Sequence, residues 1–341
     1  MQINYDLQTS ILDEIKSSLH PSISLADELA DCLSVSKDSA YRRIRGETLF
    51  DIGDLEKLTK KYNLSLDSFF GLKKSTVTFN VQSINLTDFT FIDYFNDIER
   101  NLSIIKEASP KHIFYSARDI PIFHYFQDPL LTSFKLFIWL KYYLHHPELH
   151  DTNFDTEKIP DILKSFDEMS RRIWQLYLKI PCTEIWTYET PNITLRQIEF
   201  ANQAGIIQEA SCQLLCERFK TLLNHIENQA EQGNKYSLGS KATLEGSEYN
   251  LYFHEVAIGD NSTLFTIGNR KVAFNIYANL NYMSTSDQAY IDYIEAHFHS
   301  TMKNSILISA TAQKIRSKFF NTLRNKVDIV SSKISTFSTL Y

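Results

Sequence analysis

The segment that most constrains this chain is Ser34–Glu47, SVSKDSAYRRIRGE, because it predicts a tight turn followed by a short helix. Ser36 can cap that helix, which we expect over residues 37–45, since a serine hydroxyl accepts a hydrogen bond from a free amide of the first turn. An amphipathic pattern over residues 25–33 predicts a preceding helix, with Ser24 as its N-cap. Two short helices joined by so tight a turn must pack across each other. The second helix therefore has one buried face and one free face.

The predicted helix 37–45 carries opposite chemistry on its two faces. At about 100° per residue, Ala40 and Ile44 lie close together and can pack on the preceding helix. The remaining positions hold polar or charged side chains, namely Lys37, Asp38, Ser39, Tyr41, Arg42, Arg43 and Arg45. Guanidinium groups donate paired hydrogen bonds to guanine edges and to phosphates, so the pattern predicts a helix that enters a DNA groove. The alternative is a solvated basic face that binds nothing.

Residues 1–72 predict an N-terminal all-α domain of five helices. Besides the two helices above, we expect helices over about 5–19 and 52–62 and a short one that opens at Ser65. The inward positions of the fourth helix are expected to be Ile52, Leu55, Leu58 and Tyr62. A linker is expected over residues 73–80.

The stretch LADELADCLSVSKDSAYRRIRGE, followed by DLEKLTKKYNLSLDSFF, resembles the lambda-repressor-like (XRE-type) helix-turn-helix family, and most closely its BetR-type bacterial transcriptional regulators. The resemblance covers roughly residues 25–70, about one-fifth of the chain. The family places an alanine midway along the first motif helix, which Ala30 matches, and a buried residue in the turn, which Val35 matches. It usually has glycine at the turn, where this chain has Ser34.

This resemblance implies a sequence-specific DNA-binding transcriptional regulator, with helix 37–45 in the major groove. The family positions that read bases correspond to Lys37, Asp38 and Arg42. Contacts to the DNA backbone are expected from Ser36, Ser39, Tyr41, Arg43 and Arg45. Arg43 stands where the family normally has an apolar residue, and Ile44 is the candidate to take over that packing.

The charge balance of the chain restricts how it could bind DNA. Lysine and arginine number 35 against 41 aspartate and glutamate, a net charge of −6, so any DNA contact must be local. Residues 36–47 concentrate four basic and two acidic residues. So small a footprint binds weakly alone, which favours a homodimer that places two helices about 34 Å apart on double-stranded DNA. The alternative function is a signalling adaptor that uses the same helices to bind a protein.

The remainder, residues 81–330, predicts a larger, mainly helical α+β domain for dimerisation and effector sensing. Strand patterns occur at 76–81, 112–116 and 182–189, and again at 251–258, 263–267 and 272–277. The last three, separated by Gly259-Asp-Asn and Gly268-Asn, predict a small antiparallel sheet. Two helices are expected near the end, over about 285–303 and 309–328, before a loose Ser/Thr-rich tail at 331–341.

Two features of this domain leave its role open. The apolar run 131–144 has the length of a buried core helix, because a membrane span needs about 20 apolar residues. The tryptophans at positions 139, 174 and 186 are expected in the core, with a ligand pocket as the alternative. Whether the domain senses a small-molecule or peptide effector stays open at this point.

The sequence shows no recognisable catalytic motif. It contains no glycine-rich phosphate loop, no G-x-S-x-G and no H-E-x-x-H, so we expect no enzyme activity and neither cofactor nor metal. Cys212 and Cys216, with Cys182 and His225, could supply metal ligands, but cysteines one helical turn apart are more often buried small side chains. The acidic start predicts no secretory signal, which favours a cytoplasmic protein that does not bind a membrane.

Overall fold

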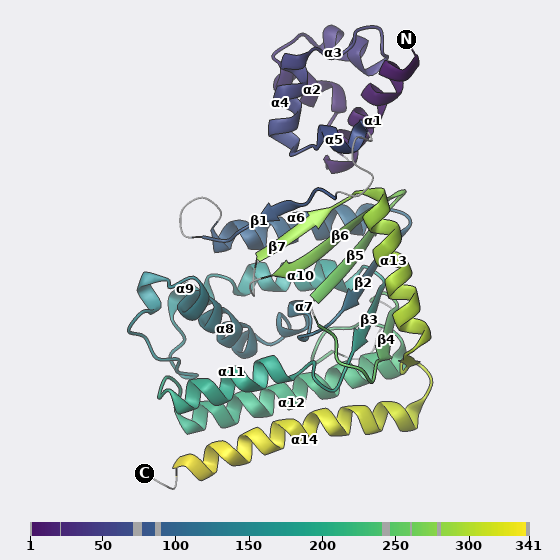
Figure 1. Ribbon diagram of the computed structural model, residues 1–341. Helices are drawn as coiled ribbons and strands as arrows, with labels where there is room; N and C mark the ends of the chain where they lie inside the picture. Colours follow the sequence, from purple (N-terminus) through teal and green to yellow (C-terminus); the bar gives the residue numbers. More distant parts are fainter. Residues whose placement is uncertain are drawn as a thin grey trace. The chain divides into compact units, whose positions relative to one another are not determined.

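The computed structural model describes residues 2–20, 22–70, 77–85, 90–240, 246–259, 261–277 and 281–338. It divides into two compact units, whose elements are labelled in Figure 1. The N-terminal unit runs from the start of the chain to Asn80 and includes Thr285–Tyr290. The sheet unit comprises Val81–Ser284 and Ile291–Tyr341.

The N-terminal unit contains the predicted helices. They are α1 (Gln2–Ser18), α2 (Leu25–Leu33), α3 (Lys37–Ile44), α4 (Ile52–Tyr62) and α5 (Leu66–Phe69). Side chains cap three of them: Ser24 and Ser36 accept hydrogen bonds from amides in the first turns of α2 and α3, and Asp51 and Asp54 form a reciprocal capping box at α4. Such caps are local, which is why the sequence predicts these helix bounds closely.

The core of the N-terminal unit lies where α1 to α4 meet. Its buried members are Ile11, Leu12, Ile15, Leu29, Ala30, Leu33, Ala40 and Leu58. Ile52 is predicted to face this core. It is instead 87% exposed, because it is the first residue of α4 and its side chain lies in solvent. Gln8 on α1 fixes the segment after α3, since its amide donates to the carbonyls of Arg43 and Thr48.

A distant piece of chain completes this unit. The Thr285 hydroxyl donates to the carbonyl of Thr78 at 2.7 Å, across 207 residues of sequence, and the Tyr290 ring packs edge-on against Phe79. The predicted domain end at residue 72 omits this return, because no local pattern links the two segments. Of the predicted linker, residues 73–76 lie outside the described residues.

The strands form a single mixed sheet. They are β1 (Asn80–Gln82), β2 (Lys111–Ser116), β3 (Cys182–Trp186), β4 (Tyr249–Phe253), β5 (Asn261–Ile267), β6 (Arg270–Tyr277), β7 (Asn281–Thr285) and β8 (Ile306–Leu307). Within the described residues the spatial order is β1-β7-β6-β5-β2-β3-β4-β8. The strands β2, β3 and β4 are parallel neighbours, whereas β5 is antiparallel to both β2 and β6, and β8 is antiparallel to β4.

The predicted small antiparallel sheet is therefore wrong in size and pairing. Strands β5 and β6 form the expected antiparallel pair, but β4 lies beside β3, with Tyr249 opposite Cys182, and two strands separate it from β5. Parallel pairing requires long crossovers, which turn patterns do not reveal. All five residues of β3 are buried, as expected for a strand covered on both faces.

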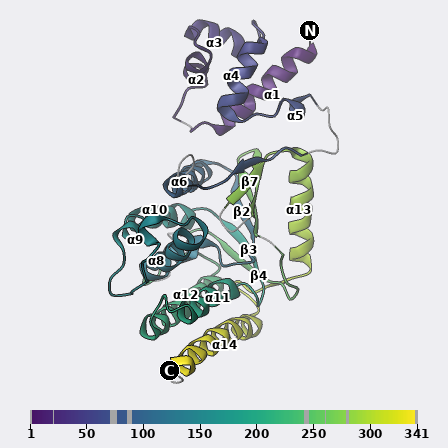
Figure 2. The ribbon, with the colours of Figure 1, turned by 60° about the vertical axis from the view of Figure 1, so that its left-hand side comes forward.

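Helices occupy the crossovers of the sheet. Before β2 lies α6 (Phe91–Glu107), and between β2 and β3 lie α7 (Ile122–Tyr125), α8 (Pro129–Ile138), a π-helix (Trp139–Tyr143), a 3₁₀-helix (Pro147–Leu149), α9 (Asp161–Lys164) and α10 (Asp167–Leu178). Between β3 and β4 lie α11 (Asn192–Gln203) and α12 (Glu209–Gln232), and α13 (Gln288–Lys303) and α14 (Gln313–Ser338) follow the last long strands. In Figure 2, α6, α8 and α10 lie on one face of the sheet and α13 lies on the other.

The apolar run at 131–144 is a core element. Residues 131–138 of α8 are all buried, and the chain continues into the π-helix without leaving the core until Lys141. In the described ranges we find no helix whose length and apolar content would let it span a bilayer.

The predicted loose tail is helical over most of its length. Helix α14 continues to Ser338, because Val330 and Ile334 are buried and the Gln213 amide of α12 donates to the Ser331 carbonyl at 2.9 Å. Local composition suggests a free end, but packing on α12 stabilises the extra turns. Residues 339–341 lie outside the described part.

Candidate functional site

The turn between α2 and α3 consists of Ser34, Val35 and Ser36. Ser34 adopts a left-handed backbone (φ 59°, ψ 46°), the conformation for which glycine is usual. The Val35 amide donates to the Ala30 carbonyl at 3.0 Å, which anchors the turn to α2. The Ser36 hydroxyl accepts from the Ser39 amide at 3.2 Å and caps α3, as predicted.

The inner face of α3 packs on α2 through small side chains. Ala40 is fully buried, Ala30 on α2 is buried, and both belong to the same core cluster. Ile44 packs against this cluster while remaining partly exposed. Small residues allow two helices to approach closely. Because Ala40 and Ile44 both pack in this cluster, the predicted inner face of α3 is confirmed.

The outer face of α3 is exposed and mainly cationic. The side chains of Lys37, Arg42 and Arg45 are 68%, 57% and 54% exposed. Asp38 and Tyr41 are exposed on the same helix. The structure thus brings together on one accessible surface the three residues expected to read DNA bases, Lys37, Asp38 and Arg42.

Acidic neighbours pair with these cations. Lys37 Nζ lies 2.6 Å from Asp27 of α2, and Arg45 forks onto the Glu47 carboxylate at 2.7 and 3.1 Å. Arg42 also reaches Glu47, at 3.6 Å. The Arg45 hydrogen bond lowers the pKa of Glu47. Exposed pairs of this kind contribute little stability, so the cations can exchange their partners for phosphates.

Arg43 has a different place from the other arginines. Its side chain is only 12% exposed, its Nε donates to Asp54 Oδ2 at 2.9 Å, and its Nη1 donates to the Ser39 hydroxyl at 2.6 Å. Because Asp54 belongs to the capping box of α4, Arg43 joins α3 to the start of α4. Arg43 and Ser39, expected at the DNA backbone, therefore already have partners inside the unit, and their contact with DNA stays a prediction. The sequence offered one signal for the inward position of Arg43, an arginine where an apolar residue is expected.

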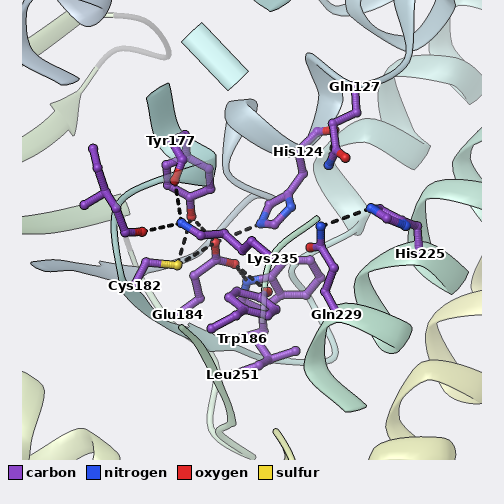
Figure 3. A network of polar contacts seen from close by, with 12 residues as sticks. His124, Gln127, Tyr177, Cys182, Glu184, Trp186, His225, Gln229, Lys235 and Leu251 are labelled. Carbon is purple, nitrogen blue, oxygen red and sulfur yellow. Dashed lines mark hydrogen bonds and ion pairs between the residues drawn. The ribbon is translucent and has the colours of Figure 1, made fainter. Parts of the chain in front are cut away.

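No pattern in the sequence predicted the buried polar network of the sheet unit. Glu184, at the centre of β3, is fully buried and accepts hydrogen bonds from His124 Nε2 at 2.8 Å and Trp186 Nε1 at 2.8 Å. The hydroxyls of Tyr177 and Tyr249 also donate to it. Figure 3 shows the side chains of His124, Tyr177 and Trp186 converging on the carboxylate from α7, α10 and β3.

The network neutralises its own charges. Burial alone would raise the pKa of Glu184, but the charge and hydrogen bond of His124, together with the other donors, hold that pKa below its usual range. The ammonium of Lys235, also fully buried, lies 3.9 Å from the centre of the Tyr177 ring and donates to the carbonyls of Tyr177 and Ile180. Burial lowers the pKa of Lys235. Since none of these side chains reaches solvent, the network stabilises the parallel strands and is not placed to act on a dissolved substrate.

The cysteines are packed as small apolar side chains. Cys182, Cys212 and Cys216 are all buried, and burial raises their pKa to about 12, 12 and 11. His225, weighed as a fourth ligand, contacts the Tyr236 carbonyl at 2.9 Å instead. Across the described ranges, no three His, Cys, Asp or Glu side chains gather closely enough to hold a metal ion.

The accessible chemistry of the N-terminal unit is therefore hydrogen-bond donation from one helix face. Arginine and lysine there can reach acceptors on a groove-shaped, anionic partner. Asp38 adds an acceptor on the same face. Comparisons of the chain with family models, with curated proteins and with solved structures found no match.

Proposed function

We propose that this chain is a sequence-specific, DNA-binding transcriptional regulator with α3 as its recognition helix. The observation that carries the proposal is the two-faced α3, with Ala40 buried against α2 and three cations more than half exposed on the other side. A major groove about 12 Å wide admits one α-helix. The resemblance of residues 25–70 to the lambda-repressor-like family, and the order of the five helices, support the same assignment.

The positions of the side chains refine the expected contacts. Lys37 and Arg42 donate to base edges, and Asp38 accepts from a cytosine amino group. Ser36, Tyr41 and Arg45 hold backbone phosphates. Arg43 and Ser39 act indirectly, because they fix the orientation of α3 through Asp54.

The small cationic surface favours a homodimer. One α3 presents few phosphate contacts, so a single copy binds weakly and salt-sensitively. Two copies related by twofold symmetry place their recognition helices about 34 Å apart, one turn of DNA. The sheet unit supplies the dimer contact in this proposal, and the protein acts in the cytoplasm, where bacterial DNA lies.

Selection of bound fragments from genomic DNA by the full-length protein tests the proposal. We expect a palindromic site with half-sites one DNA turn apart. The adaptor function would instead give no enrichment of any DNA and no salt-dependent binding, and that result would reject DNA recognition.

Point variants then assign the roles within α3. Arg42→Gln is expected to reduce affinity for the selected site by about tenfold or more and to relax one base position, with little effect on random DNA. Lys60→Gln, an exposed cation on α4 paired with Glu56, serves as the matched control and should leave the preference unchanged. An equal loss on selected and random DNA would remove Arg42 from base reading.

A further inference from the structure

A cavity of about 380 Å³ opens at the carboxyl end of β2. The loop after β2 lines it with Arg118–Ile120, and Asn261, the first residue of β5, also lines it. This end of β2 lies where the parallel strands meet the antiparallel ones, since β3 is parallel and β5 antiparallel to β2. Sheets with parallel strands bind ligands at their carboxyl ends, and cavities of 300 to 1,000 Å³ are typical of small-molecule sites.

The cavity contains a buried ion pair whose charges cancel. Lys135 of α8 is 1% exposed, and its Nζ donates to Asp119 Oδ2 at 3.0 Å, Thr194 Oγ1 at 3.1 Å and Gln197 Oε1 at 3.0 Å. The other Asp119 oxygen accepts from the Ile120 amide at 2.8 Å. Both charged groups are therefore satisfied by the protein, and neither needs a ligand.

The polar groups left over are donors. The Arg118 side chain is exposed, lines the cavity and forms no ion pair with any described residue. Asn261 Oδ1 accepts from the amides of Arg118 and Asp119, at 2.9 and 3.2 Å, which leaves its amide NH₂ for a ligand. The Gln197 side chain is similar: its Oε1 accepts from Lys135 Nζ, which leaves its amide NH₂ for a ligand. A site with one unpaired guanidinium and spare amide donors favours an anion.

The walls of the cavity are aromatic. Five rings line it, those of Tyr94, Tyr115, Trp139, Tyr143 and Tyr277. Burial raises the pKa of Tyr94 to about 12 and that of Tyr115 well above its usual value, so both hydroxyls stay neutral. Aromatic walls favour a flat apolar body, which stacks or packs edge-on against them.

We infer that this cavity binds a small aromatic carboxylate, with the carboxylate on Arg118 and the ring against Tyr94, Tyr115 and Trp139. The binding goes beyond DNA recognition and does not require it. The use of the cavity as an effector site rests on the proposed function, so ligand binding is measured first without DNA.

Calorimetric titration of the full-length protein with benzoate tests the inference, with benzamide as the neutral probe of the same shape. We expect saturable binding of benzoate below about 10 mM and binding of benzamide at least about tenfold weaker, because the charge-assisted pair with Arg118 is lost. No saturation by benzoate in this range, or equal binding of the two probes, would overturn the inference.

Variants of Arg118 locate the site. Arg118→Gln should reduce benzoate affinity by about tenfold, to the level of benzamide, and Arg118→Lys should retain part of the affinity because it keeps the charge but loses the fork. Arg196→Gln, an exposed arginine on α11 outside this cavity, is the matched control. Unchanged affinity in Arg118→Gln would reject the site even if benzoate binds elsewhere. A second titration with selected DNA present asks whether benzoate shifts DNA affinity, and failure there leaves the binding result intact.

Discussion

The outer face of α3 and the network around Glu184 use charge in opposite ways. On α3, cations are more than half exposed and share acidic partners such as Glu47, which solvent screens. Around Glu184, every charged atom is buried and the carboxylate accepts from four separate side chains. Exposed pairs can exchange partners at little cost, whereas a buried carboxylate that accepts from four side chains cannot. Charge on α3 is thus available to another molecule, and charge at Glu184 stabilises the fold.

The largest effect should follow from removing the buried carboxylate. Glu184→Ala leaves His124 and three neutral donors without an acceptor, and we expect the free energy of unfolding of the sheet unit to fall by about 3–5 kcal/mol. Tryptophan fluorescence in a urea titration measures it, because all three tryptophans lie between residues 139 and 186. A variant of an exposed ion-paired carboxylate, Glu168→Ala, should change stability by less than about 1 kcal/mol. Equal stabilities of the two variants would contradict a structural role for the network.

A smaller loss in the free energy of unfolding should appear when the pH is lowered. Burial lowers the pKa of His225 to about 4, so the folded state disfavours protonation that the unfolded state accepts near pH 6.5. The stability that His225 contributes is therefore complete above pH 6.5 and is lost as the pH falls toward 4, by on the order of 2–3 kcal/mol. His225→Gln should flatten this loss in urea titrations at a series of pH values.

The pH experiment has a matched control. His299→Gln removes a histidine that is mostly exposed on α13, and its slope of stability against pH is the reference with which the slope of His225→Gln is compared. A slope that is the same in the wild type and in His225→Gln would assign the acid sensitivity to other groups.

The smallest effect should come from the exposed carboxylate of Glu47, three residues after the end of α3. Glu47→Gln removes the acidic partner of Arg42 and Arg45, and we expect DNA to bind about two- to fivefold more tightly at low salt, with the gain shrinking as salt rises. Fluorescence anisotropy with the selected site and with random DNA measures it. Weaker binding in this variant would show that Glu47 positions the arginines for DNA instead of competing with it.

Local features of the sequence determined the N-terminal unit well. The caps at Ser24 and Ser36 and the spacing of Ala40 and Ile44 lie within single helices, so the pattern predicts both the helix bounds and the buried face of α3. The exposed position of Arg42 follows from the same spacing. Arg43 was the exception, because its partner Asp54 lies on a different helix.

Only the tertiary structure decided the sheet unit. Parallel pairing brings Cys182 beside Tyr249 in this unit. The N-terminal unit has one contact of the same long range, the hydrogen bond from Thr285 to Thr78 across 207 residues. Periodicity and capping act over a few residues, whereas these contacts depend on long crossovers and on what each strand meets when the chain closes. The carboxylate of Glu184 and the guanidinium of Arg118 look alike in the sequence as isolated charges. Glu184 is buried and accepts from four side chains, whereas Arg118 is exposed and lines a cavity; that difference in surroundings is why we give the first a structural role and propose the second as a ligand contact.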